Sequence, residues 1–140
     1  MLKILKRILT LLMFLVVLCA VIFGGLRILG YRPYSVKTES MLPEYKVGSL
    51  VYVREMDFDD LKPGDVITFV NDDTQKVVTH RITEIDNDER MVYTKGDNNE
   101  YPDIKPVYEE NIIGKVDFSI PMLGKISETI TESFDKVFDR

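Results

Sequence analysis

Four side chains in this sequence could together perform acyl-transfer chemistry. Ser40 precedes His80, the single histidine of the chain, and Asp97 and Asp103 follow in a polar stretch. A serine hydroxyl is a poor nucleophile unless a base takes its proton, and neutral imidazole, with an unperturbed pKa of about 6.5, can do so near neutral pH. A carboxylate bonded to the other ring nitrogen would fix the tautomer of the histidine. These residue types therefore allow a Ser-His-Asp hydrolase site.

Each of these features also has an ordinary structural explanation when taken alone. Ser40 could be a turn or helix-capping serine, and His80 could be a core histidine satisfied by hydrogen bonds. Residues 96–99, Gly-Asp-Asn-Asn, could form no more than a β-turn, because turns prefer these residues. The combination and its order in the chain favour catalysis, and both aspartates are candidates for the orienting carboxylate.

Short strands must position these side chains. In the predicted strand 76–85, alternation places Val78, His80, Ile82 and also Glu84 on one face, so His80 shares a face with apolar side chains. The spacing of short strands and turns predicts a mainly β domain, a small twisted barrel or sandwich. The strands are predicted at residues 48–54, 66–70, 76–85, 91–94 and 112–116.

The C-terminal residues, 121–140, change to a helical period. Apolar side chains recur at intervals of three or four residues, which predicts an amphipathic helix. The helix could pack on the domain, lie at a lipid surface or meet a partner helix, and all three remain open. The periodic positions are Leu123, Ile126, Ile130, Phe134 and Val137.

The N-terminal segment is predicted to be a transmembrane anchor. Residues 8–26 are nineteen uncharged residues, close to the roughly 20 that cross the hydrocarbon as a helix. A removable signal peptide would have a shorter apolar core and a small-residue cleavage site, and Cys19 fits as an apolar filler of the helix. We therefore expect an uncleaved anchor over residues 1–30 and a catalytic β-domain over residues 31–120.

Composition excludes several other classes of function. Residues 1–30 hold four of the 18 basic and none of the 23 acidic residues, which leaves 14 basic against 23 acidic residues and a net charge of −9 in the remainder. Nucleic acid is therefore not an expected partner. One cysteine excludes an intramolecular disulfide, and one histidine makes a protein-only zinc site improbable. We expect no cofactor and no metal.

The order of the motifs resembles that of type I signal peptidases. Ser-Met-x-Pro at residues 40–43 follows a membrane helix, His80-Arg81 ends an apolar run, and Lys-Gly-Asp-Asn-Asn at residues 95–99 precedes Asp103. Histidine stands where the bacterial housekeeping branch has a lysine base, which is typical of the endoplasmic-reticulum-type branch. The resemblance implies Ser40 as nucleophile, His80 as general base, Asp103 as the preferred orienting acid and Asp97 in support, although the two aspartates could exchange roles.

The same resemblance implies an oxyanion site and substrate contacts. The family uses the backbone N–H of the nucleophile and a nearby hydroxyl, and Thr38 matches the position of that hydroxyl. Met41, within the Ser-Met box, is the other residue expected beside the substrate. Glu39 departs from the small residue that the family usually has between Thr38 and Ser40.

The resemblance further implies the substrates and the location. Preproteins with signal peptides would be the substrates, with pockets that select alanine-like residues before the cut. The enzyme would be a single-pass protein of the cell membrane with its domain on the extracytoplasmic side. Ten steps along the chain lead from Gly30 to Ser40, so the nucleophile lies within roughly 36 Å of the helix end. The bilayer is thus an expected partner, while the need for accessory membrane subunits stays open.

Two alternatives make different predictions. Serine self-cleaving repressors share this β-architecture, but they use a lysine base and lack an anchor, so His80 and the apolar segment count against them. In a single-pass adaptor or binding module, the three motifs would be turns and core residues, and the protein would have no catalytic activity. Loss of preprotein cleavage on substitution of Ser40 or His80 would separate an enzyme from an adaptor.

Overall fold

The computed structural model describes residues 2–121. Helix α1 (Leu2–Ile28) is one continuous helix of 27 residues. Its stretch from Lys3 to Ile28 contains an 18-residue window with a mean hydropathy of 2.8, none of it buried, and at about 1.5 Å per residue the helix exceeds the roughly 30 Å of bilayer hydrocarbon. By length and composition, α1 can cross a membrane. The predicted helix at residues 121–140 lies almost entirely outside the described residues.

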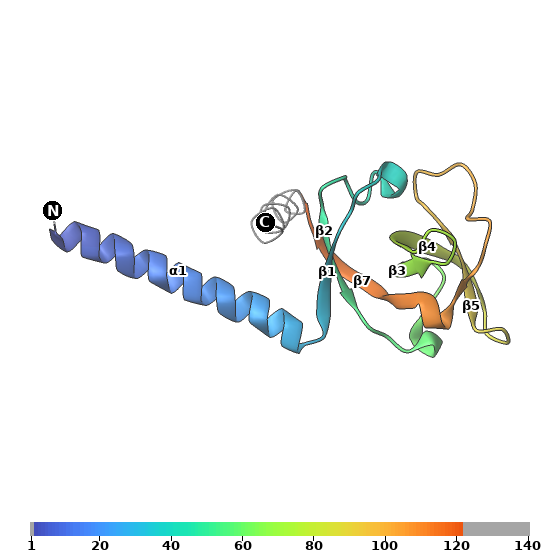
Figure 1. The fold of residues 1–140 in the computed structure, drawn as a ribbon, viewed down its shortest axis with the longest axis horizontal. Helices are drawn as coiled ribbons and strands as arrows, with labels where there is room; N and C mark the ends of the chain where they lie inside the picture. Colours follow the sequence, from blue (N-terminus) through green and yellow to red (C-terminus); the bar gives the residue numbers. More distant parts are fainter. Residues whose placement is uncertain (1, 122–140) are drawn as a thin grey trace, which may run out of the picture. The chain divides into compact units, whose positions relative to one another are not determined.

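The residues after the helix form a mainly β domain, as predicted (Figure 1). One seven-stranded sheet has the order β1-β2-β7-β3-β4-β5-β6, and the pairings from β2 onwards are antiparallel. Three short 3-10 helices, η1 (Glu39–Met41), η2 (Phe58–Asp60) and η3 (Glu109–Asn111), interrupt the loops. The strands are β1 (Tyr31–Ser35), β2 (Leu50–Arg54), β3 (Val66–Asn71), β4 (Lys76–Asp86), β5 (Met91–Lys95), β6 (Val107–Tyr108) and β7 (Ile112–Ile120).

All five predicted strands are present, and two short ones are additional. Strand β1 reads Tyr-Arg-Pro-Tyr-Ser and lacks the apolar alternation that identifies a half-buried strand. Strand β6 has only two residues, between Pro106 and η3. Both β1 and β6 lie at the ends of the strand order, where a strand pairs on one side only and needs less apolar surface.

Two apolar clusters form the interior of the domain, and candidate site residues adjoin both clusters. One cluster gathers side chains from η2, β3, β4, β5 and β6, and the other gathers side chains from η1, β2, β3 and β7. The first consists of Phe58, Leu61, Ile67, Phe69, Ile82, Val92 and Val107. The second consists of Val36, Met41, Val51, Val53, Val66 and Val116.

Strand β4 presents His80 to the first cluster. His80 pairs with Ile67 on β3, and Val78 and Ile82 flank it on the same face, as the alternation predicts. The register with β5 then shifts between Ile82 and Glu84. A bulge of this kind reverses which side chains face inward, so Ile85 packs on the cluster while Glu84 is exposed. The predicted placement of Glu84 on the His80 face is therefore wrong.

Candidate active site

Ser40 lies in η1, a single turn fixed by its buried neighbour. The Met41 side chain is only 1% exposed and belongs to the second apolar cluster, so it anchors the turn from below. Thr38 precedes the turn in extended conformation, and its Oγ1 lies 3.0 Å from Ser40 Oγ, within hydrogen-bonding distance. The structure thus puts a second hydroxyl beside the candidate nucleophile. The Met41 side chain, which was expected beside the substrate, is buried in the second apolar cluster.

The loop that follows β5 fixes the backbone of Ser40. The N–H of Asn98 donates a hydrogen bond to the Ser40 carbonyl at 2.8 Å. A side chain on Gly96 would place its Cβ 2.7 Å from the same carbonyl oxygen, closer than carbon and oxygen can pack. Glycine is therefore needed at residue 96 so that the loop can approach η1.

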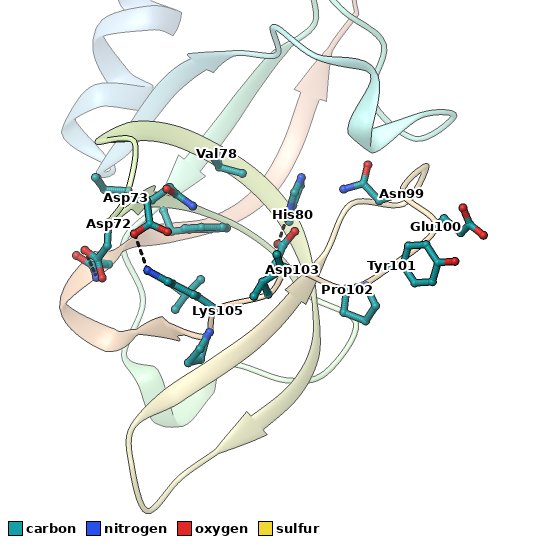
Figure 2. A pocket seen from close by; sticks show the side chains of 17 residues that line it. Asp72, Asp73, Val78, His80, Asn99, Glu100, Tyr101, Pro102, Asp103 and Lys105 are labelled. Carbon is teal, nitrogen blue, oxygen red and sulfur yellow. Dashed lines mark hydrogen bonds and ion pairs between the residues drawn. The ribbon is translucent and has the colours of Figure 1, made fainter.

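His80 is held by Asp103 through one ring nitrogen. Nδ1 of His80 lies 2.6 Å from Asp103 Oδ2, and the pair is visible at the border of a pocket in Figure 2. An ionised carboxylate only accepts hydrogen bonds, so Nδ1 donates to Asp103, and in the neutral imidazole Nε2 keeps its lone pair. The His80 side chain is largely buried, and its ring lies in a T-shaped arrangement with that of Phe69. Within residues 2–121, Nδ1 makes the only hydrogen bond of the ring.

Thr94 completes the setting of Asp103. The Thr94 hydroxyl donates to Asp103 Oδ2 at 2.6 Å, and the Asp103 N–H donates to the Thr94 carbonyl at 2.8 Å. Thr94 is fully buried. Burial raises the pKa of Asp103, but the hydrogen bonds from His80 and Thr94 and the charge of His80 outweigh burial, so the pKa lies below its ordinary value. Asp103 is therefore kept as the carboxylate that an imidazolium needs.

Asp97 serves a different neighbour. Its two carboxylate oxygens accept hydrogen bonds from Arg81 Nε at 2.8 Å and Nη2 at 2.7 Å, and Arg81 Nη1 donates to the Gly64 carbonyl at 2.8 Å. The hydrogen bonds with Asp97 outweigh burial and raise the pKa of Arg81. The bidentate pair joins the loop after β5 to β4 and to the turn before β3. Asp97 does not contact His80 through a hydrogen bond in the described structure.

The fold brings these segments together from distant positions in the sequence. The turn η1 lies against β4, and the loop that carries Asp97, Asn98 and Asp103 contacts both. In the part of the chain that the structure describes, no hydrogen bond joins Ser40 Oγ to His80, since the Ser40 hydroxyl pairs with Thr38. Catalytic hydrogen bonds commonly tighten only when substrate binds, so the arrangement is compatible with proton transfer from serine to histidine.

Three contributors to the site were not among the residues predicted from the sequence. Thr94 lies one residue before the end of β5 and gives no signal, because its role depends on the loop returning to β5. Arg81 follows His80 directly. Because adjacent strand residues point to opposite faces of a sheet, the sequence could have indicated that Arg81 has a different partner from His80. Gly96 was part of the Gly-Asp motif, but its contact with Ser40 is visible only in the structure. No group of three or more histidine, cysteine, aspartate or glutamate residues within residues 2–121 is arranged to hold a metal ion.

Comparisons with known proteins agree with this fold and site. The family model described as Peptidase S24-like matches residues 33–117, which include every candidate site residue. Signal peptidase I W of Bacillus subtilis is 45% identical over 92 residues, which make up 64% of this chain and 48% of the relative. The signal peptidase complex catalytic subunit SEC11 of Lachancea thermotolerans is 32% identical over 110 residues, 67% of this chain and 62% of the relative.

A more distant match extends the same pattern. The human signal peptidase complex catalytic subunit SEC11C is 25% identical over 99 residues, 63% of this chain and 51% of the relative. The chain thus spans between about half and 62% of the length of these relatives. Their names confirm the resemblance to signal peptidases that the three motifs indicate.

Proposed function

The chain belongs to the Peptidase S24-like family, and from this premise we propose that it is a serine endopeptidase that removes N-terminal signal peptides from preproteins. Ser40 is the nucleophile, His80 the general base and Asp103 the residue that orients His80. Residues 31–120 form the catalytic domain and residues 1–30 its anchor. The proposal is supported by similarity to proteins that are named signal peptidases.

One observation carries the assignment of roles. His80 Nδ1 and Asp103 Oδ2 lie 2.6 Å apart, on a strand that contacts the turn bearing Ser40. A buried histidine with a carboxylate on Nδ1 presents an unprotonated Nε2, which is the nitrogen that a general base uses. The Arg81 partner of Asp97 leaves no comparable role for that carboxylate.

The reaction follows from these groups. Ser40 Oγ attacks the carbonyl carbon of the scissile bond while its proton passes to His80 Nε2, and Asp103 stabilises the resulting imidazolium. The Ser40 N–H and the Thr38 hydroxyl donate to the oxyanion. Thr38 is suited to this because its Oγ1 already lies 3.0 Å from the attacking oxygen. His80 then gives the proton to the leaving amine, and water, activated by the same nitrogen, releases the acyl group.

Substrate binding is proposed at a free strand edge. Strand β4 pairs with β5 only from Arg81 onwards, so residues 76–79 have one strand partner, β3, among the described strands. An extended preprotein can pair with this edge through main-chain hydrogen bonds, with small side chains before the cut.

The apolar helix anchors the enzyme in the cell membrane as a single-pass protein, and the domain works on the extracytoplasmic side. Activity of the purified chain alone would show that accessory subunits are dispensable.

The test uses the full chain in lipid vesicles with a preprotein substrate. We expect Ser40→Ala and His80→Ala each to abolish cleavage, because the nucleophile and its base act as one unit. Ser119→Ala, a serine on β7, is the matched control and should cleave normally. Circular dichroism should show all three variants folded. Full cleavage by either site variant would contradict the proposal.

A further inference from the structure

A pocket of about 550 Å³ lies on the side of His80 that faces Asp103 (Figure 2). Its walls come from the β3–β4 hairpin on one side and from residues 99–107 on the other. Phe69, Val78 and Val107 contribute apolar surface. Neither Ser40 nor Thr38 lines the pocket. The roles proposed above use His80, Asp103 and the β4 edge at Val78 on its walls, but they give the volume itself no occupant.

Two polar contacts hold the walls of the pocket in position. Lys105 Nζ lies 2.5 Å from Asp73 Oδ1, and Asn111 Nδ2 donates to Asp72 Oδ1 at 3.0 Å. Both contacts join the β3–β4 hairpin to segments that follow β5. The opening between these segments is therefore formed in advance, as in most ligand sites.

The chemistry of the proposed reaction indicates which part of a substrate would reach this pocket. The nitrogen that accepts the serine proton later protonates the leaving amine, so the first residue after the cut must lie against His80. In that pose the oxyanion donors, Thr38 and Ser40, would lie on the other side of the scissile carbonyl. The chain after the cut thus begins at His80 Nε2. It reaches the pocket, which borders His80 and Asp103 on the Nδ1 side of the ring, by passing across the imidazole.

We propose that this pocket binds the first few residues after the cleaved bond and accepts a bulky apolar side chain from them. The proposal rests on the proposed peptidase function and adds a specificity site on the leaving side of the substrate. The rim supports an apolar occupant, because Ile104 is fully exposed and Tyr101 is 71% exposed. Covering them would remove apolar surface from water, the main source of binding energy in such sites.

The charges at the rim add a second selection. Asp72, Asp73 and Glu100 line the pocket against a single lysine, Lys105, which is paired with Asp73. An acidic substrate side chain would meet repulsion at this rim. The pocket should therefore accept Phe or Leu and reject Glu at the same substrate position.

The experiment measures kcat/KM with the full chain in vesicles. A preprotein receives Phe, Ala or Glu at each of the first four positions after the cut, with the residues before the cut unchanged. We expect one position at which Phe exceeds Ala by roughly tenfold and Glu falls below Ala. Equal rates for Phe and Ala at all four positions would overturn the inference.

Enzyme variants assign that preference to the pocket. Ile104→Ser should reduce the Phe-to-Ala ratio to roughly threefold or less, since the exposed isoleucine no longer covers the phenyl group. Tyr108→Ser is the matched control, because Tyr108 is an exposed apolar residue outside the pocket lining, and it should leave the ratio unchanged. A ratio that Ile104→Ser does not alter would contradict the assignment.

A binding measurement separates failure of this inference from failure of the proposed function. Fluorescence anisotropy records the Kd of labelled peptides with the leaving-side sequence for the full-length Ser40→Ala protein, in the same vesicles. The Phe peptide should bind several-fold more tightly than the Ala peptide, and Ile104→Ser should reduce the difference. Binding without cleavage by the wild-type enzyme would contradict only the peptidase function, and cleavage with equal peptide binding would contradict only the pocket.

Discussion

Asp97 and Asp103 lie on the same loop, yet they belong to two regions with different tasks. Their side chains are similarly buried, at 19% and 25% exposure, so burial does not distinguish them. Their partners do, because Asp97 pairs with Arg81 and Asp103 pairs with His80. Arg81 and His80 are neighbours on β4 and point to opposite faces of the sheet. The two faces of β4 therefore separate two roles: Asp97 holds the loop to β4 through Arg81 (the fastening region), and Asp103 orients His80 (the orienting region).

The largest expected effect would come from the orienting region. Asp103→Asn should lower kcat by roughly 10³- to 10⁴-fold, because an amide in place of the carboxylate no longer selects the Nδ1–H tautomer or stabilises the imidazolium. Asp97→Asn should lower kcat much less. Steady-state cleavage of a preprotein in vesicles measures both variants. Equal losses would remove the distinction between the two aspartates.

The fastening region should instead affect stability. Asp97→Asn replaces the charge in a bidentate pair that is partly exposed to solvent, and we expect the free energy of unfolding to fall by about 1–2 kcal/mol. Asp59→Asn is the control, since Asp59 bonds Arg90 at an exposed position, and its effect should stay within about 0.5 kcal/mol. Urea unfolding in detergent micelles compares them. An unchanged stability for Asp97→Asn would contradict a fastening role.

Thr94 offers a finer division within the orienting region. Thr94→Val keeps the shape but removes the hydroxyl that bonds Asp103, and we expect kcat to fall roughly tenfold with little change in KM. Thr94→Ser restores the hydroxyl and should recover most of the activity. A loss that serine does not rescue would indicate that Thr94 acts through packing alone.

The smallest expected effect concerns acid stability. Because the pKa of folded Asp103 lies below its ordinary value of 3.8, its ionised form stabilises the fold at neutral pH, and this contribution is lost as the pH falls below about 4 through the folded-state pKa. Asp103→Asn should therefore flatten the stability profile below pH 4 relative to the wild type. Urea midpoints measured between pH 2 and pH 7 test this. An unchanged acid slope would contradict the lowered pKa.

Much of the fold and half of the candidate site are predictable from the sequence. The rest is not predictable, because it depends on contacts that form only in the folded chain. An uncharged apolar run identifies helix α1, and β-branched and aromatic runs bounded by turn residues identify five strands. Chemical type and order identify Ser40 and His80 as candidates. The choice between the two aspartates depends on where residues 96–103 return to β5, through the hydrogen bond from Asp103 N–H to the Thr94 carbonyl. Local sequence does not encode that contact. The bulge after Ile82 is hidden for the same reason.

The single histidine permits one direct test of the central claim, that Asp103 orients His80. In the ¹⁵N-histidine-labelled protein at neutral pH, NMR should show the Nδ1–H tautomer and a strongly downfield proton on Nδ1. Asp97→Asn should retain this proton signal and Asp103→Asn should lose it. An Nε2–H tautomer in the wild type, or a signal that survives in Asp103→Asn and disappears in Asp97→Asn, would contradict the account.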